Sequence, residues 1–123
     1  MSKPFTLNLC IKDIVTELTR DAPDDKHLRA GFLTGEGNVI DGVVVPDQVS
    51  STAYIQLDMG QAIIDLKHKG IKIIGLVQYN GMFPAFESAA TQQTRVIMSG
   101  LTGNDTYGLI VNMRGETYRL DKI

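Results

Sequence analysis

The sequence has few of the residues that build covalent or metal-bound frameworks. Its 123 residues include one cysteine, two histidines and no tryptophan. Cys10 alone cannot form an internal disulfide, and we expect it to be a packed or half-buried residue of the first helix. His27 and His68 lack the close spacing, or the neighbouring cysteines, that are typical of zinc sites. Neither a disulfide-stabilised scaffold nor a simple zinc motif is therefore indicated.

An excess of charge of one sign and long hydrophobic runs are also missing. The chain has 12 Lys and Arg against 14 Asp and Glu, a formal net charge of −2 at pH 7. Proteins that neutralise nucleic-acid phosphates usually carry a basic excess, so we expect no nucleic-acid partner. No apolar run reaches the ~18 residues of a membrane-spanning helix, and the first residues lack the apolar core of a signal peptide. We expect a cytoplasmic protein with no membrane partner.

The residues that are present fit one globular domain. Hydrophobic residues make up 43% of the chain and charged residues 21%, which is close to the average of folded domains. A chain of this length buries about two thirds of the surface that its unfolded form exposes. No internal repeat or low-complexity segment interrupts it. The sequence therefore predicts a single domain over residues 1–123.

Apolar periodicity and turn residues divide the first half into helix and strand segments. The helical spacing of apolar residues predicts a helix over 7–20, which Pro23 brings to an end. Two apolar and β-branched runs, 28–34 and 39–45, flank the turn residues of 35–38. This pattern predicts a β-hairpin.

The second half of the chain also contains both helix and strand segments. Asp58 as N-cap and Gly70 as C-cap bracket a second helix. The apolar run 71–77 predicts a central strand with both faces largely covered. We also expect strands over 52–57, 95–98, 107–111 and 117–120, and a short helix over 89–93. This order of elements favours the α+β class.

Two segments resemble the motifs of the JAB/MPN metalloprotease family. The first, Leu-Arg-Ala-Gly-Phe-Leu-Thr-Gly over 28–35, places its two glycines as in the family's glutamate motif. The second, 75–91, is similar to the family's pattern of His-x-His-Pro, a loop and Ser-x-x-Asp. If Gln78 stands at the first histidine position, Ser88 falls at the serine position and Thr91 at the aspartate position. The order of the flanking elements resembles that family as well.

The resemblance implies a JAB/MPN-like, cytidine deaminase-like fold, a curved mixed sheet with packed helices. In active members a glutamate acts as general acid/base on a zinc-bound water. Two histidines and an aspartate hold the zinc, and a serine stabilises the tetrahedral intermediate. The corresponding positions here are Leu28 for the glutamate, Gln78 and Asn80 for the histidines, Ser88 for the serine and Thr91 for the aspartate. Amide and hydroxyl oxygens are weak zinc ligands, and a leucine cannot transfer a proton.

We therefore expect a catalytically inactive, metal-free domain with no cofactor, acting as a protein-binding or scaffold module. Its partner would be another MPN domain, a second copy of the chain or a ubiquitin-like protein. Two alternatives stay open. One is an enzyme that uses unrelated chemistry in the remodelled pocket, where Glu87 is the local titratable residue. Glu36 or Glu87 in place of Leu28 as the general base of the family's reaction would still leave no zinc site. The other is a small-molecule-binding protein that uses a remodelled pocket of the retained polar residues. Those residues could also simply hydrogen-bond to one another.

Overall fold

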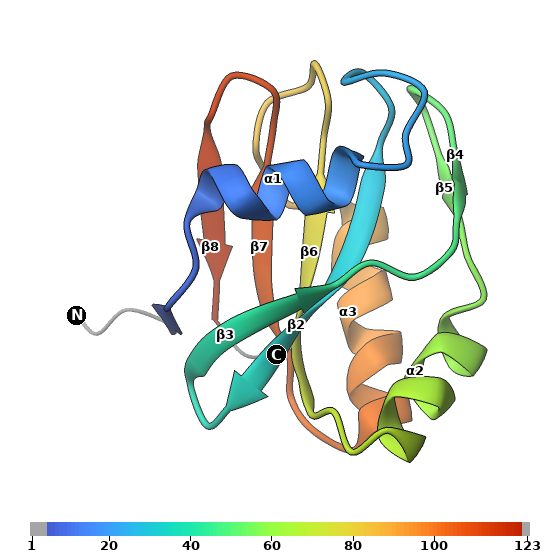
Figure 1. Cartoon of the computed structure of the whole chain (residues 1–123), viewed down its shortest axis with the longest axis vertical. Helices are drawn as coiled ribbons and strands as arrows, with labels where there is room; N and C mark the ends of the chain where they lie inside the picture. The colour runs from blue at the N-terminus through green and yellow to red at the C-terminus, as the bar shows by residue number, and fades with distance from the viewer. Residues whose placement is uncertain (1–4, 122–123) are drawn as a thin grey trace.

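A mixed six-stranded sheet forms the centre of the molecule in the computed structural model, which describes residues 5–121 (Figure 1). The strand order is β1-β3-β2-β6-β7-β8, and a separate two-stranded sheet pairs β4 with β5. The elements in chain order are β1 (Thr6–Leu7), α1 (Ile11–Thr19), β2 (Arg29–Glu36), β3 (Val39–Val44), β4 (Val49–Ser50), β5 (Ile55–Gln56), α2 (Met59–His68), β6 (Ile73–Tyr79), α3 (Ala89–Thr102), β7 (Tyr107–Val111) and β8 (Thr117–Leu120).

The sheet is mixed because two kinds of connection join its strands. β2 pairs antiparallel with β3 and β6, and β7 with β8. β6 and β7 run parallel because the chain returns between them through α3, the usual way to join parallel neighbours. The short β1 also runs parallel, beside β3. The predicted α+β class with a curved mixed sheet is confirmed.

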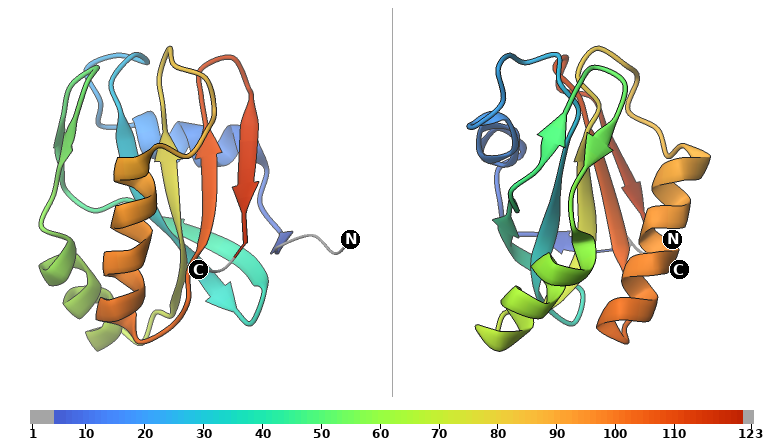
Figure 2. Two further views of the ribbon diagram at one scale, coloured as in Figure 1. Left: turned by 180° about the vertical axis from the view of Figure 1, so that it is seen from behind. Right: turned by 90° about the vertical axis from the view of Figure 1, so that its right-hand side faces the viewer.

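Helices cover both faces of the sheet. α1 lies across one face, and α2 and α3 lie side by side on the other (Figure 2). Each face has its own apolar core, because side chains alternate between the faces along a strand. On β6, Val77 packs in the α1 core and Leu76 in the core under α2 and α3. Gln78 shares the orientation of Leu76, so it points toward α3.

The predicted central strand and its preceding helix are confirmed. β6 lies between β2 and β7 and is buried along nearly its whole length. Asp58 caps α2, where its side chain accepts from the backbone N–H of Gln61 at 3.0 Å. Gly70 follows α2 with φ +73°, the left-handed conformation that suits glycine.

The first helix is shorter than predicted. α1 begins at Ile11, whereas Leu7 lies in β1 and pairs with Ile40 of β3. The backbone N–H groups of Thr6 and Asn8 donate to the carbonyls of Asn38 and Ile40. This segment thus gains a strand partner that local periodicity cannot reveal. Cys10 occupies the N-cap position and is exposed, so the expectation of a packed helical cysteine was wrong.

The predicted strand over 95–98 is also wrong, because α3 continues to Thr102. Thr91, Arg95 and Met98 are its buried residues, and their spacing places them on one side of a helix. Gly103 then ends the helix in the left-handed conformation. The predicted strand over 52–57 shrinks to Ile55–Gln56 in β5. Within residues 5–121, no helix has the length and apolar character needed to cross a bilayer.

Candidate functional site

The sequence-predicted polar residues meet where the end of β6 faces the start of α3. Gln78 and Asn80 lie at the end of β6 and directly after it. Ser88 is the N-cap of α3, and its side chain accepts from the backbone N–H of Thr91 at 3.1 Å. Thr91 lies in the first turn of the helix and is buried. Two elements that are joined by a nine-residue loop thus place all four side chains together.

These side chains form one continuous chain of hydrogen bonds. Oγ of Ser88 lies 3.0 Å from Oγ1 of Thr91, and Thr91 Oγ1 donates to Oε1 of Gln78 at 2.9 Å. Nε2 of Gln78 donates to Oδ1 of Asn80 at 3.0 Å. Nδ2 of Asn80 donates to the main-chain carbonyl of Pro84 at 2.9 Å. This chain of hydrogen bonds links the loop, the strand and the helix through neutral groups.

The carbonyl of Pro84 fixes the direction of every bond. A carbonyl only accepts, so Asn80 must present its amide nitrogen to Pro84 and its oxygen to Gln78. Gln78 must then present its nitrogen to Asn80 and its oxygen to Thr91. The single hydroxyl hydrogen of Thr91 goes to Gln78, which leaves the hydroxyl of Ser88 as the donor to Thr91. Both hydroxyl hydrogens are used inside the chain.

A cleft of about 420 Å³ lies beside this chain. Gln78, Ser88 and Thr91 line its polar side, and Leu28 lies at its wall. The segment that leads into α2 supplies further walls, which the sequence motifs gave no reason to expect: Tyr54, Ile55, Leu57 and Met59. The cleft is therefore mainly apolar with one polar edge.

Gly81 stands at the position that is proline in the resembling motif. Its φ is +60°, and a Cβ there would lie 2.5 Å from the carbonyl oxygen of Lys26. A proline is fixed near φ −65° and could not take this conformation. The loop after β6 is thus built around a glycine turn, whose carbonyl also accepts from the backbone N–H of Met113 at 3.0 Å.

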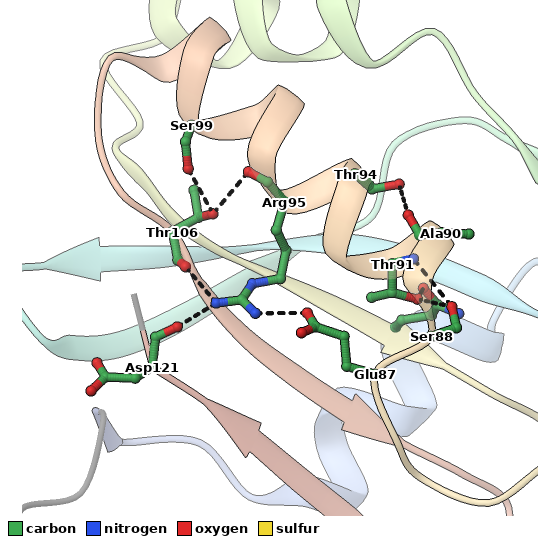
Figure 3. A network of polar contacts seen from close by, with 10 residues as sticks. Glu87, Ser88, Ala90, Thr91, Thr94, Arg95, Ser99, Thr106 and Asp121 are labelled. Carbon is green, nitrogen blue, oxygen red and sulfur yellow. Dashed lines mark hydrogen bonds and ion pairs between the residues drawn. The ribbon is translucent and has the colours of Figure 1, made fainter. Parts of the chain in front are cut away.

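A second polar network joins α3 to the sheet one turn further along (Figure 3). The side chain of Arg95 is 3% exposed, and its Nη1 lies 2.6 Å from Oε2 of Glu87. It also donates to the main-chain carbonyls of Thr106, at 3.0 Å, and Asp121. Gly108 makes room for it, because a Cβ there would come within 3.0 Å of Nε of Arg95. Sequence reasoning missed this pair, since nothing local marks a buried arginine.

The two glutamates considered as substitute bases do not lie in the cleft. Glu87 is held by Arg95, and Glu36 ends β2, whereas Ala30 near the opposite end of that strand lines the cleft. Among residues 5–121, no three His, Cys, Asp or Glu side chains are grouped so that they could hold a metal ion.

The curved mixed sheet, with α1 on one face and α2 and α3 on the other, matches the fold of a solved JAB1/MPN domain protein. The chain is similar over 97% of its length to a crystal structure of a JAB1/MPN domain protein from Archaeoglobus fulgidus, with a TM-score of 0.57, 15% identity and 94% of that chain covered. It is also similar to the solution structure of a protein from Desulfitobacterium hafniense, with a TM-score of 0.57, 16% identity and coverage of 94% of this chain and 80% of the other.

No family model matches the chain, and no curated protein matches it by sequence. The structural similarity to the JAB1/MPN domain protein establishes an MPN-like fold.

The metal that this fold family implies is zinc, and the donor set here does not fit it. The positions that the resemblance assigns to zinc ligands hold Gln78, Asn80 and Thr91, which offer neutral amide and hydroxyl groups. Protein zinc sites use thiolate, imidazole or carboxylate ligands. The hydrogen bonds among these side chains also occupy the oxygens of Gln78 and Asn80.

Proposed function

We propose that this chain is a metal-free MPN-like domain that works by binding a protein rather than by hydrolysing one. The observation that carries the proposal is the directed hydrogen-bond chain from Ser88 to Pro84. Its members satisfy one another, as buried polar groups do in a structural role. Leu28 adds to this argument, since it lines the cleft where the resemblance places a general base and has no titratable proton.

The exposed apolar side chains support a binding role. Met82 and Phe83 lie in the loop after β6, and Met113 in the β7–β8 turn that hydrogen-bonds to this loop. All three are more than two fifths exposed. Val96 and Ile97 on α3 are half exposed. Exposed apolar side chains that gather on one surface are typical of protein interaction sites.

The test is zinc titration by calorimetry and elemental analysis of two proteins. One is the unchanged chain, and the other is the triple variant Gln78→His, Asn80→His, Thr91→Asp. We expect no stoichiometric zinc in the unchanged chain and one zinc per chain in the variant, because imidazole and carboxylate replace the weak ligands. One tightly bound zinc in the unchanged chain would overturn the proposal. A folded variant without zinc would show that these positions are not equivalent to the family's ligands.

The cleft favours one second candidate, a small-molecule binder. The hydrogen-bond chain leaves one amide hydrogen of Gln78 and one lone pair of the Ser88 hydroxyl outside its bonds. They edge a cleft of about 420 Å³ with apolar walls, which is the size and character of many ligand sites. A metabolite that binds there would raise the melting temperature by mass action. Loss of that shift in Tyr54→Ala, at an exposed side chain of the cleft wall, would locate the site.

A further inference from the structure

A second hollow lies at the opposite end of β6 and α3 from the cleft. The cleft takes in Gln78 near the end of β6 and Ser88 at the start of α3. The second hollow, of about 270 Å³, takes in the first residue of β6 and Thr102, the last residue of α3. We call it the lysine pocket, and its lining includes Ile63, Lys67, Ile71, Lys72, Ile73 and Asn104.

The lining of the lysine pocket carries positive charge and no negative charge. Lys67 lies in the last turn of α2, and Lys72 lies in the short connection from α2 to β6. None of the described residues that line the pocket is Asp or Glu. Within residues 5–121 the ion pairs use other cations, so neither lysine has a carboxylate in contact. Two like charges at one hollow repel each other, and a bound anion would relieve that repulsion.

The end of α2 accounts for one lysine but not for both. A cation in the last turn of a helix interacts favourably with the free carbonyl groups there, which suits Lys67. The carbonyl of Lys67 itself accepts from the backbone N–H of Gly70 at 3.0 Å, so this helix end is capped by the chain. Lys72 lies beyond the helix. Its carbonyl accepts from the backbone N–H of Gly35 at 3.3 Å, which holds this second cation beside β2.

The remaining walls of the lysine pocket are mainly apolar. Ile63, Ile71 and Ile73 line it and pack in the core under α2 and α3. Asn104 adds a neutral amide. Most sites for drug-sized ligands measure about 300–1,000 Å³, so this pocket suits a smaller molecule. A matching ligand has one negative group for the lysines and a short apolar part for the isoleucines.

We propose that the lysine pocket binds a small organic anion, a carboxylic acid with a short hydrocarbon body. Its carboxylate accepts charge-assisted hydrogen bonds from the ammonium groups of Lys67 and Lys72. Its hydrocarbon body covers the isoleucine side chains and leaves water. The inference goes beyond the proposed function, because it assigns a ligand to a separate site at the other end of β6.

The experiment is a titration of the full chain followed by two-dimensional NMR, with three probes at one ionic strength. Hexanoate has both the charge and the hydrocarbon body, hexanol has the body without the charge, and inorganic phosphate has the charge without the body. We expect hexanoate to bind at least about tenfold more tightly than either of the others. The largest shifts should fall on the backbone amides of Gly70, Lys72 and Asn104.

Three charge-removing variants locate the carboxylate. Lys67→Met and Lys72→Met keep most of the side-chain length, and each should weaken hexanoate binding about tenfold, as loss of a charge-assisted bond does. The matched control is Lys69→Met. It changes the net charge equally, but Lys69 lines a different hollow beside Val44, so hexanoate binding should be unchanged. All three variants should fold, because the three lysines are exposed.

Three results would overturn the proposal. The first is hexanoate that binds no more tightly than hexanol or phosphate. The second is a set of shifts centred on the cleft around Gln78 instead of the lysine pocket. The third is a Lys69→Met variant that loses as much affinity as Lys67→Met and Lys72→Met. The zinc titration concerns the opposite end of β6, so the proposed function stands or falls separately.

Discussion

Two polar networks fasten α3 to the sheet, and they do so with different chemistry. Near the start of the helix, Ser88 and Thr91 join Gln78 through neutral hydrogen bonds. One turn later, Arg95 joins Glu87 through a buried ion pair. A neutral hydrogen bond contributes about 1 kcal/mol net. A buried ion pair contributes little net, but it is costly to break on one side.

The difference shows which network tolerates substitution. In the neutral network each member can be replaced at moderate cost, because no charge is stranded. The network also lies at the cleft, where the family resemblance places catalytic residues. The charged network points away from the cleft toward β7 and the end of β8. The neutral network is therefore a site that tolerates change, whereas the charged network holds the helix in place.

Removing the charge of Arg95 should have the largest effect. Arg95→Met should lower the free energy of unfolding by about 3 kcal/mol, the lower end of the range for a broken buried pair. The lower end applies because Glu87 is 16% exposed and can turn toward water. Urea denaturation measures the change. The double variant Arg95→Met, Glu87→Gln should recover part of the loss, and a double variant less stable than Arg95→Met would contradict the ion-pair account.

Breaking the neutral network should cost less. Thr91→Val keeps the shape of the side chain but leaves Oε1 of Gln78 without its donor and the hydroxyl hydrogen of Ser88 without its acceptor. We expect a loss of about 1–3 kcal/mol by urea denaturation. The control is Thr94→Val on the same helix, whose hydroxyl donates only to the carbonyl of Ala90. That change should stay within about 0.5 kcal/mol. Equal effects of the two substitutions would show that the network adds nothing.

The sequence predicted the neutral network better than the charged one, and the reason is physical. The spacing of Gln78, Ser88 and Thr91 resembles a family motif in which strand and helix residues converge, and this resemblance grouped them. Their direction depends on the Pro84 carbonyl, a backbone atom without a sequence signal.

Elements defined by local preference were predicted well, as for α2 between Asp58 and Gly70. Elements defined by distant partners were not. Leu7 follows the helical period of α1, yet it is a strand residue that pairs with Ile40 of β3. The run that begins at Arg95 is predicted as a strand, yet it lies within a long helix. Arg95 is buried there against Gly108 and Glu87. Tertiary contacts decided both cases, and neither contact leaves a local pattern.

The smallest effect expected concerns pH, because the neutral network has no group that titrates. Dependence on pH can be tested at Tyr79, which lies between Gln78 and Asn80 in the sequence. It is the last residue of β6 and packs in the α1 core. Its hydroxyl donates to the carbonyl of Asp25 at 2.5 Å. Burial raises the pKa of Tyr79 above its ordinary value of 10.0, and the negative charges of Asp25 and Asp24 raise it further.

A pKa that is higher in the folded state favours the folded protein below the unfolded value. The contribution of Tyr79 is therefore fully present below about pH 10 and is lost as pH rises through the folded pKa. We expect the stability difference between the unchanged chain and Tyr79→Phe to shrink as the pH rises above about 10 in urea denaturation. The difference between the unchanged chain and Thr91→Val should stay constant over that range, since none of the partners of Thr91 ionises. If the Thr91→Val difference fell in parallel with the Tyr79→Phe difference, the stability contribution of Thr91 would depend on an ionising group. The network around Thr91 would then not be independent of titrating groups.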